Sequence, residues 1–154
     1  MTSANHDQVM QLQRLFAQGA EARGRAYRVL IVDDEPRVLE LLSDFCDSSE
    51  VIRADLVSSV SDARTKLSQD RYDLVTFDLV MPEMSGLDGL HLVRKSHPQI
   101  PVLIITGNST DKLINEAGVA GAVQVLEKPI SLPHFLSALW KGLNRPSVAA
   151  GITS

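Results

Sequence analysis

The sequence predicts an α/β protein built on a doubly wound, five-stranded parallel sheet, preceded by one extra helix. Short runs of nearly continuous apolar residues alternate along the chain with segments in which apolar residues recur at helical spacing. These runs lack the polar alternation of strands that have one face in water, so helices are expected to cover both faces of the sheet. The 154 residues suit a single domain.

The N-terminal segment stands apart from this alternating pattern. Over residues 7–22 the apolar side chains fall on one side of a helical wheel, which predicts an amphipathic helix. These apolar residues are Val9, Leu12, Leu15, Phe16 and Ala20. Gly19 and Gly24 are expected to mark the end of the helix, and fewer than two heptads are too few for a coiled coil. Residues 1–27 therefore have two open interpretations: a loosely packed extension, or a helix that docks a partner or forms a homodimer.

Two strand–helix pairs follow this segment. Residues 28–32 form a β-rich apolar run that ends at acidic residues. A helix is expected to begin at Pro36, because the N–H that proline lacks is not needed at the first position of a helix. The buried side of that helix is predicted to consist of Val38, Leu41, Leu42 and Phe45. Residues 55–58 predict a weaker strand, and residues 60–69 predict a helix capped by a nearby serine.

Three further pairs complete the pattern. Their predicted strands cover residues 73–77, 101–105 and 122–126. Their predicted helices cover residues 87–97, 111–117 and 132–143. The first of these helices is expected to stop before Pro98, because proline cannot continue a helix. Residues 144–154 have little to bury and are predicted to form a flexible tail.

Composition and charge exclude several classes of protein. The net charge of −4 and the lack of a basic stripe argue against a dedicated nucleic-acid binder. No apolar run is long enough to cross a bilayer, and the N-terminus lacks the apolar core of a signal peptide. The single cysteine, Cys46, allows neither an internal disulfide nor a site built from several thiolates. We therefore expect a cytoplasmic protein whose direct partners are neither nucleic acids nor membranes.

Polar side chains follow four of the predicted strands. Asp33 and Asp34 follow the first strand, Asp78 the third, Thr106 the fourth and Lys128 the fifth. Ligands of open α/β sheets bind beyond the carboxyl ends of the strands, so these side chains are expected to meet at one edge. Taken singly, each has an ordinary interpretation, since aspartate and threonine cap helices and most lysines are solvated.

The chemistry of this set points to a phosphorylated aspartate. Carboxylates that are packed together repel one another, and Mg²⁺ is a cation that prefers carboxylate and water oxygens. An aspartate beside the metal can act as a nucleophile towards phosphorus and form an acyl phosphate. Lys128 and Thr106 would then stabilise the oxygens of the transferred group. The residues therefore predict a Mg²⁺-dependent aspartyl phosphate site.

Four short stretches together resemble the receiver domain of two-component response regulators, of the kind found in chemotaxis regulators. They are residues 29–36 (VLIVDDEP), 77–86 (FDLVMPEMSG), 104–107 (IITG) and 126–129 (LEKP). The resemblance implies a flavodoxin-like sheet with the strand order 2-1-3-4-5. It makes residues 28–143 the receiver domain and residues 1–27 an N-terminal helical extension.

The resemblance also implies which residues bind the metal and accept the phosphoryl group. Asp78 corresponds to the phosphoacceptor. Asp34 corresponds to the direct Mg²⁺ ligand and Asp33 to its water-mediated companion. Val80 corresponds to the residue whose backbone carbonyl binds the metal.

Further positions concern the phosphoryl oxygens and the response to them. Thr106 corresponds to the hydroxyl that turns towards the phosphoryl group, and Lys128 to the lysine that pairs with it. The Lys128–Pro129 bond is expected to be cis, as is usual in the family. The family has Tyr or Phe three residues before the lysine, whereas this chain has Val125. The aromatic switch that relays phosphorylation to the last helices is therefore absent or replaced.

The resemblance implies a phosphorylation-controlled response regulator. A histidine kinase or a histidine phosphotransfer protein would donate the phosphoryl group, docking near Arg37, Leu39 and Pro129, and an unknown downstream protein would be the target. Such a domain catalyses only its own phosphorylation and dephosphorylation, so it is not otherwise an enzyme. An aspartate-based phosphatase is disfavoured, because Val80 stands where such enzymes place a second acid. The alternative is an interaction scaffold that uses the N-terminal helix independently of phosphorylation.

Overall fold

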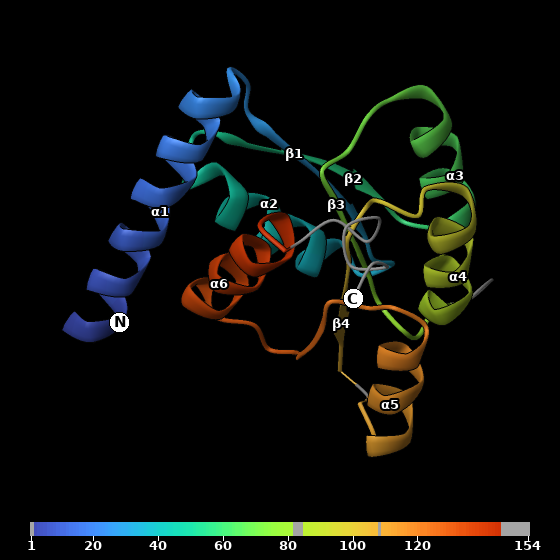
Figure 1. Ribbon diagram of the computed structural model, residues 1–154. Helices are drawn as coiled ribbons and strands as arrows, with labels where there is room; N and C mark the ends of the chain where they lie inside the picture. Colours follow the sequence, from blue (N-terminus) through green and yellow to red (C-terminus); the bar gives the residue numbers. More distant parts are fainter. Residues whose placement is uncertain (1, 82–84, 108, 146–154) are drawn as a thin grey trace, which may run out of the picture.

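The computed structural model describes residues 2–81, 85–107 and 109–145 of the chain. Its strands are β1 (Tyr27–Val32), β2 (Ile52–Val57), β3 (Leu74–Phe77), β4 (Val102–Thr106) and β5 (Gln124–Glu127). They form one parallel sheet in the order β2-β1-β3-β4-β5 (Figure 1). This arrangement confirms the predicted fold class and strand order.

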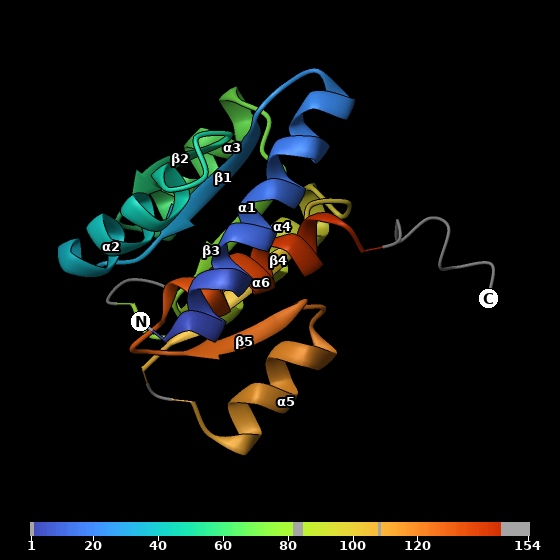
Figure 2. The ribbon, with the colours of Figure 1, turned by 90° about the vertical axis from the view of Figure 1, so that its left-hand side faces the viewer.

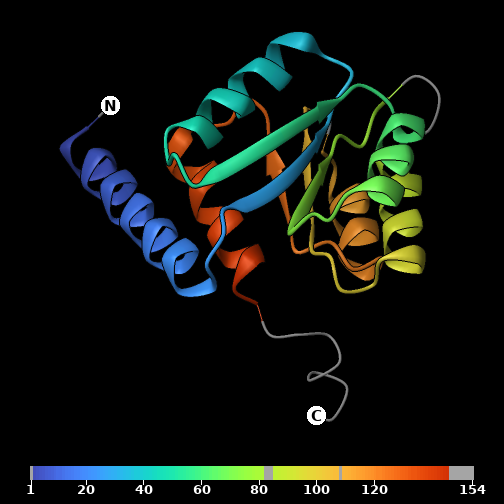
Figure 3. The ribbon, with the colours of Figure 1, turned by 90° about the horizontal axis from the view of Figure 1, so that it is seen from above.

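Helices cover both faces of the sheet. They are α1 (Ser3–Arg23), α2 (Pro36–Asp47), α3 (Val60–Gln69), α4 (Gly86–Ser96), α5 (Asp111–Val119) and α6 (Leu132–Leu143). Figure 2 shows α1 running alongside α6 on one side of the sheet, the side that also carries α2. In the view from above, α3, α4 and α5 form the opposite layer (Figure 3). None of the helices in the described part of the chain is long and apolar enough to span a bilayer.

Successive residues of β1 face opposite helical layers. Val29 and Ile31 pack with the layer that contains α1, α2 and α6, whereas Leu30 and Val32 pack with α3, α4 and α5. All four side chains are buried. This burial on both sides explains why the strand appears in the sequence as an unbroken apolar run.

The N-terminal helix is longer than its apolar pattern predicts. α1 begins at Ser3, because the hydroxyl of Thr2 accepts a backbone hydrogen bond from the first turn at 3.1 Å. It continues through Gly19, one of the two glycines predicted to mark its end, and stops at Gly24, which has φ 74°. A Cβ at position 19 would collide with the hydroxyl of Tyr27, so Gly19 permits a close approach rather than ending the helix.

One strand boundary also differs from its prediction. The strand predicted at 55–58 begins at Ile52. It lies at the edge of the sheet, where Arg53 and Leu56 are exposed, so its sequence lacks the unbroken apolar run of the inner strands. The other boundaries agree with their predictions to within about two residues. Of the predicted flexible tail 144–154, all but the first two residues lie outside the described part of the chain.

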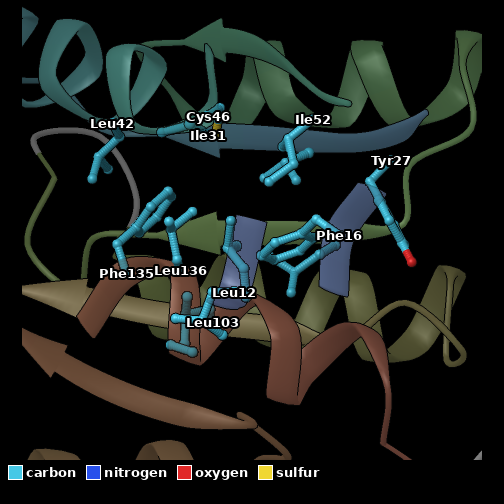
Figure 4. Close-up of a cluster of buried hydrophobic side chains, with 14 of the residues drawn as sticks. Leu12, Phe16, Tyr27, Ile31, Leu42, Cys46, Ile52, Leu103, Phe135 and Leu136 are labelled. Atoms are coloured by element: carbon cyan, nitrogen blue, oxygen red, sulfur yellow. The ribbon is translucent and has the colours of Figure 1, made fainter. Parts of the chain in front are cut away.

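The apolar face of α1 packs against the chain's own α6 and β1. Phe16 is fully buried, and its ring meets Trp140 and Tyr27 edge-to-face, with centroid distances of 5.2 Å and 5.7 Å. Figure 4 shows Phe16 and Leu12 in one cluster with Leu136. The side of α1 that a homodimer or a docked partner was expected to use is therefore covered within the chain.

Ion pairs hold the end of α1 near the start of β3. Arg23 Nη2 donates to Asp73 Oδ1 at 2.6 Å, and Arg25 Nη2 donates to the same oxygen at 3.2 Å. The backbone N–H of Arg28 donates to Asp73 Oδ2 at 2.8 Å. Burial alone would raise the pKa of Asp73, but these hydrogen bonds and positive charges lower it below its usual value. The N-terminal segment is thus attached by both apolar and polar contacts.

Candidate functional site

The polar residues that follow the strands meet at one edge of the sheet. The last residues of β1 and β3 are paired in the register, so Asp33 and Asp78, which come next, lie close together. Thr106 is the last residue of β4. Its carbonyl accepts a hydrogen bond from the backbone N–H of Lys128, just after β5, at 2.9 Å. The topology therefore gathers the predicted site residues as the strand-end rule requires.

The ammonium group of Lys128 lies among the carboxylates of this edge. Its Nζ is 2.9 Å from Asp33 Oδ2, 2.9 Å from Asp78 Oδ2 and 2.9 Å from Glu35 Oε1. The side chains of Asp33 and Asp78 are 3% and 5% exposed, whereas that of Glu35 is 58% exposed. Burial alone would lower the pKa of Lys128, but the hydrogen bonds to the three carboxylates raise it above its usual value. Lys128 is therefore a fixed positive charge at the site.

Backbone N–H groups orient the two buried carboxylates. Asp33 Oδ1 accepts from the N–H of Glu35 at 2.9 Å, and Asp78 Oδ1 accepts from the N–H of Val80 at 3.1 Å. Burial raises the pKa of Asp33, and the hydrogen bonds from Lys128 and from the backbone only partly offset this effect. Each carboxylate has one oxygen held by the backbone and the other by the lysine, so its orientation is fixed.

The acidic residues at this edge fit a divalent cation. Asp33, Asp34, Glu35 and Asp78 each place a carboxylate oxygen such that all four oxygens lie within 4.8 Å of one another. One ammonium group leaves a negative excess among four carboxylates, and a small cation with oxygen ligands would balance it. The structure thus brings together the three carboxylates predicted to bind Mg²⁺ and adds a fourth. Val80, predicted to offer its backbone carbonyl, is 53% exposed, and its backbone N–H donates to Asp78.

The remaining predicted positions lie around this group. Thr106 is fully buried, and the Lys128–Pro129 peptide bond is cis, as expected. Val125 is half-buried on β5, where it pairs with Ile104 and packs against the core of the α3, α4 and α5 layer. A small aliphatic side chain therefore occupies the position at which the family pattern has an aromatic ring.

Glu35 is the residue of this group that the sequence analysis did not assign. It is the N-cap of α2, but it makes no side-chain cap hydrogen bond there. It reaches instead to Lys128, 93 residues further along the chain. Its signal in the sequence is its place directly after Asp33 and Asp34, and nothing in that spacing predicts a contact with the lysine.

Comparison with known proteins agrees with this geometry. Residues 29–139 match the family model of the response regulator receiver domain. The chain is 30% identical to the chemotaxis protein CheY of Thermotoga maritima over 114 residues, which cover 74% of this chain and 95% of that protein. It is 32% identical to the probable transcriptional regulatory protein TcrX of Mycobacterium tuberculosis over 130 residues, covering 82% of this chain.

Other relatives are longer than this chain. The alignment with TcrX spans 54% of that protein. The response regulator protein PilR of Pseudomonas aeruginosa is 35% identical over 105 residues, which cover 68% of this chain but only 23% of PilR. Among solved structures, the signal receiver domain of an HD domain-containing protein from Pseudomonas fluorescens matches with a TM-score of 0.73 and 26% identity, covering 77% of this chain and 95% of that one. The match to the family model spans nearly all of the sheet and of the helices α2 to α6, so the chain belongs to the response regulator receiver domains of two-component systems.

Proposed function

We propose that this receiver domain accepts a phosphoryl group on Asp78 with Mg²⁺ bound beside it, and that it signals by binding another protein. The observation that carries the proposal is the position of Lys128 Nζ, 2.9 Å from both Asp78 and Asp33. It supports a site in which a nucleophilic carboxylate, further acidic ligands and a fixed positive charge act on one anion.

The proposed cation site consists of the carboxylates of Asp33, Asp34 and Asp78 and the backbone carbonyl of Val80. Magnesium bound there would neutralise negative charge on the transferred group. The backbone N–H groups that hold Asp33 and Asp78 keep two of these carboxylates in place before the cation binds. No rearrangement of the strand ends is then needed to form the site.

The proposed transfer uses the carboxylate of Asp78 as the nucleophile. One of its oxygens forms a bond to phosphorus. The bond between phosphorus and the donor's histidine nitrogen breaks, and its electron pair stays on that nitrogen, which takes up a proton from water. Lys128 donates hydrogen bonds to the phosphoryl oxygens, and the hydroxyl of Thr106 turns towards them. Hydrolysis of the acyl phosphate by water restores the carboxylate, so the domain acts on itself alone.

The proposal places the donor at the edge of the sheet that carries the site. A histidine kinase or a histidine phosphotransfer protein docks around Arg37, Leu39 and Pro129, and since such donors act in the cytoplasm, the chain is placed there too. Residues 28–143 are the receiver domain, and residues 1–27 are a helical extension packed on it. A homodimer would need a surface other than the apolar side of α1, which the chain itself covers.

The direct test is phosphorylation by a small acyl phosphate, followed by intact mass. A single phosphoryl adduct is expected in the presence of Mg²⁺, and chelation of the metal is expected to abolish it. Peptide mapping should locate the adduct on Asp78. The absence of an adduct in a folded protein that binds Mg²⁺ would contradict the proposal.

A second candidate function is a scaffold whose binding does not depend on phosphorylation. The observation that favours it is Val125, a small aliphatic residue at the position of β5 where the family has an aromatic ring that relays a change at the site. A scaffold would bind its partner equally well before and after treatment with the acyl phosphate. A difference in partner affinity or oligomeric state between the two forms would rule this candidate out.

The acyl phosphate is expected to hydrolyse slowly, over minutes or longer, because Val80 offers no polar side chain to an attacking water. Val80→Asn would supply an amide at this exposed position and should accelerate hydrolysis by about three- to tenfold, the effect of one hydrogen bond. The measurement is the decay of the adduct after removal of the phosphate donor. Val80→Ile keeps the position apolar and serves as the control. An unchanged rate in Val80→Asn would refute this explanation.

A further inference from the structure

Glu35 forms a contact that the proposed function does not use. The ammonium group of lysine has three N–H donors. In this structure three carboxylates share them, and Asp33, Glu35 and Asp78 each lie 2.9 Å from Lys128 Nζ. A phosphoryl oxygen can therefore bind Lys128 only if one carboxylate gives up its hydrogen bond.

Exposure decides which of the three carboxylates is the easiest to displace. Asp33 and Asp78 are buried and are also held by backbone N–H groups. The side chain of Glu35 is 58% exposed, and among the described residues its ion-pair partner is Lys128. Water can solvate Glu35 once it is released, whereas a released buried carboxylate would lose its partner without solvent.

The start of α2 shows that Glu35 is not there to cap its own helix. In the other five helices of the described residues, a serine or threonine at the N-cap accepts a hydrogen bond from the first turn. Glu35 makes no such bond. Glutamate is not a preferred N-cap residue, so this position gives up local helix stability while the side chain reaches across to the lysine.

We propose that Glu35 competes with the phosphoryl group for Lys128 and, by the same negative charge, strengthens cation binding at the site. This inference rests on the proposed function, since it concerns the arrival of a phosphoryl group at Asp78. The fourth carboxylate attracts a divalent cation, because its oxygen lies within 4.8 Å of those of the other three. It repels the negatively charged phosphoryl donor and occupies the third donor of the ammonium group. One charge thus has opposite effects on the two steps.

Glu35→Gln tests this inference because it removes the charge and keeps the shape. Mg²⁺ affinity, measured by isothermal titration calorimetry of the full chain, is expected to fall by about three- to fivefold, as for a partly exposed charge. The rate of phosphorylation by a small acyl phosphate at saturating Mg²⁺, measured by intact mass, is expected to rise by a similar factor. Glu40→Gln is the matched control, since Glu40 is exposed on the same helix and forms no ion pair among the described residues. It should change neither quantity.

The outcomes separate this inference from the proposed function. Opposite changes in the two quantities support the competition. A slower phosphorylation rate in Glu35→Gln would instead make Glu35 a positioning residue for Lys128. An unchanged rate and an unchanged Mg²⁺ affinity would give Glu35 no role at the site. Either result overturns the inference while the proposed function stands. A wild-type chain that binds Mg²⁺ but forms no adduct would overturn the proposed function first. Glu35→Ala, which removes the side chain, should repeat the result of Glu35→Gln if charge is the cause.

Discussion

Asp78→Asn is expected to reduce the phosphoryl adduct to background. An amide is a much weaker nucleophile than a carboxylate, and it cannot form the acyl phosphate. In the wild type, Asp78 Oδ2 lies 2.9 Å from Lys128 Nζ, and Asp78 Oδ1 accepts the N–H of Val80. Asparagine keeps the shape of the side chain, so the change isolates the chemistry. Intact mass after incubation with a small acyl phosphate and Mg²⁺ measures the result.

The Asp78→Asn variant should also remain folded, which keeps its failure to react informative. It removes one of four carboxylates whose oxygens lie within 4.8 Å, while Lys128 keeps Asp33 and Glu35 as partners. The thermal midpoint in metal-free buffer is therefore expected to equal or exceed that of the wild type. Asp44→Asn, at an exposed position on α2, is the control and should form the adduct normally. An adduct that persists in Asp78→Asn would place the acceptor on another residue.

The fold class could be predicted because the sheet is covered on both faces. Helices 60–69 and 132–143 have the bounds that their sequence predicts, since Ser59 and Ser131 cap them. The prediction begins the edge strand β2 three residues too late in the chain. Only the two end residues of this strand, Ile52 and Val57, are buried, and the residues between them are partly or fully exposed, so the strand lacks the unbroken apolar run on which the prediction depends. Sequence patterns thus report burial, and they weaken where an element is only half buried.

The site could be predicted as far as backbone topology determines it. Asp33, Asp78 and Lys128 come together because their strands are parallel neighbours or near neighbours in the sheet, and strand ends can be located in the sequence. The contact between Glu35 and Lys128 depends on two side-chain rotamers and on the lack of a cap at α2. Such details follow from packing in three dimensions and leave no periodic signal in the chain.

The place of the N-terminal helix shows a second limit of sequence patterns. An apolar face indicates that a helix packs on something, but it does not indicate what covers it. The structure supplies the answer, because Phe16 lies between Tyr27 and Trp140. Gly19, which resembles a helix end in the sequence, allows Tyr27 to approach the helix. The apolar side of this helix therefore packs against the chain's own α6 and β1.

Phe16→Ala is accordingly expected to cost about 3–5 kcal/mol of unfolding free energy, the usual cost of emptying a buried phenylalanine site. The side chain is fully buried, and its two edge-to-face contacts with Trp140 and Tyr27 would be lost as well. Since a domain of ordinary stability has about 5–15 kcal/mol in total, this is a large fraction. Chemical denaturation measures the free energy, and the thermal midpoint should fall by roughly 10 °C.

Met10→Ala on the same helix provides the contrast that interprets the Phe16 result. Met10 is 43% exposed, so its removal should change stability by less than about 0.5 kcal/mol. A large effect at Phe16 with none at Met10 requires that α1 packs through its predicted apolar side in solution. Equal and small effects would mean that α1 is detached from α6 there, and the apolar side of α1 would again be available to a second copy or to a partner. The pair of variants therefore decides between a helix that completes the domain and one that extends from it.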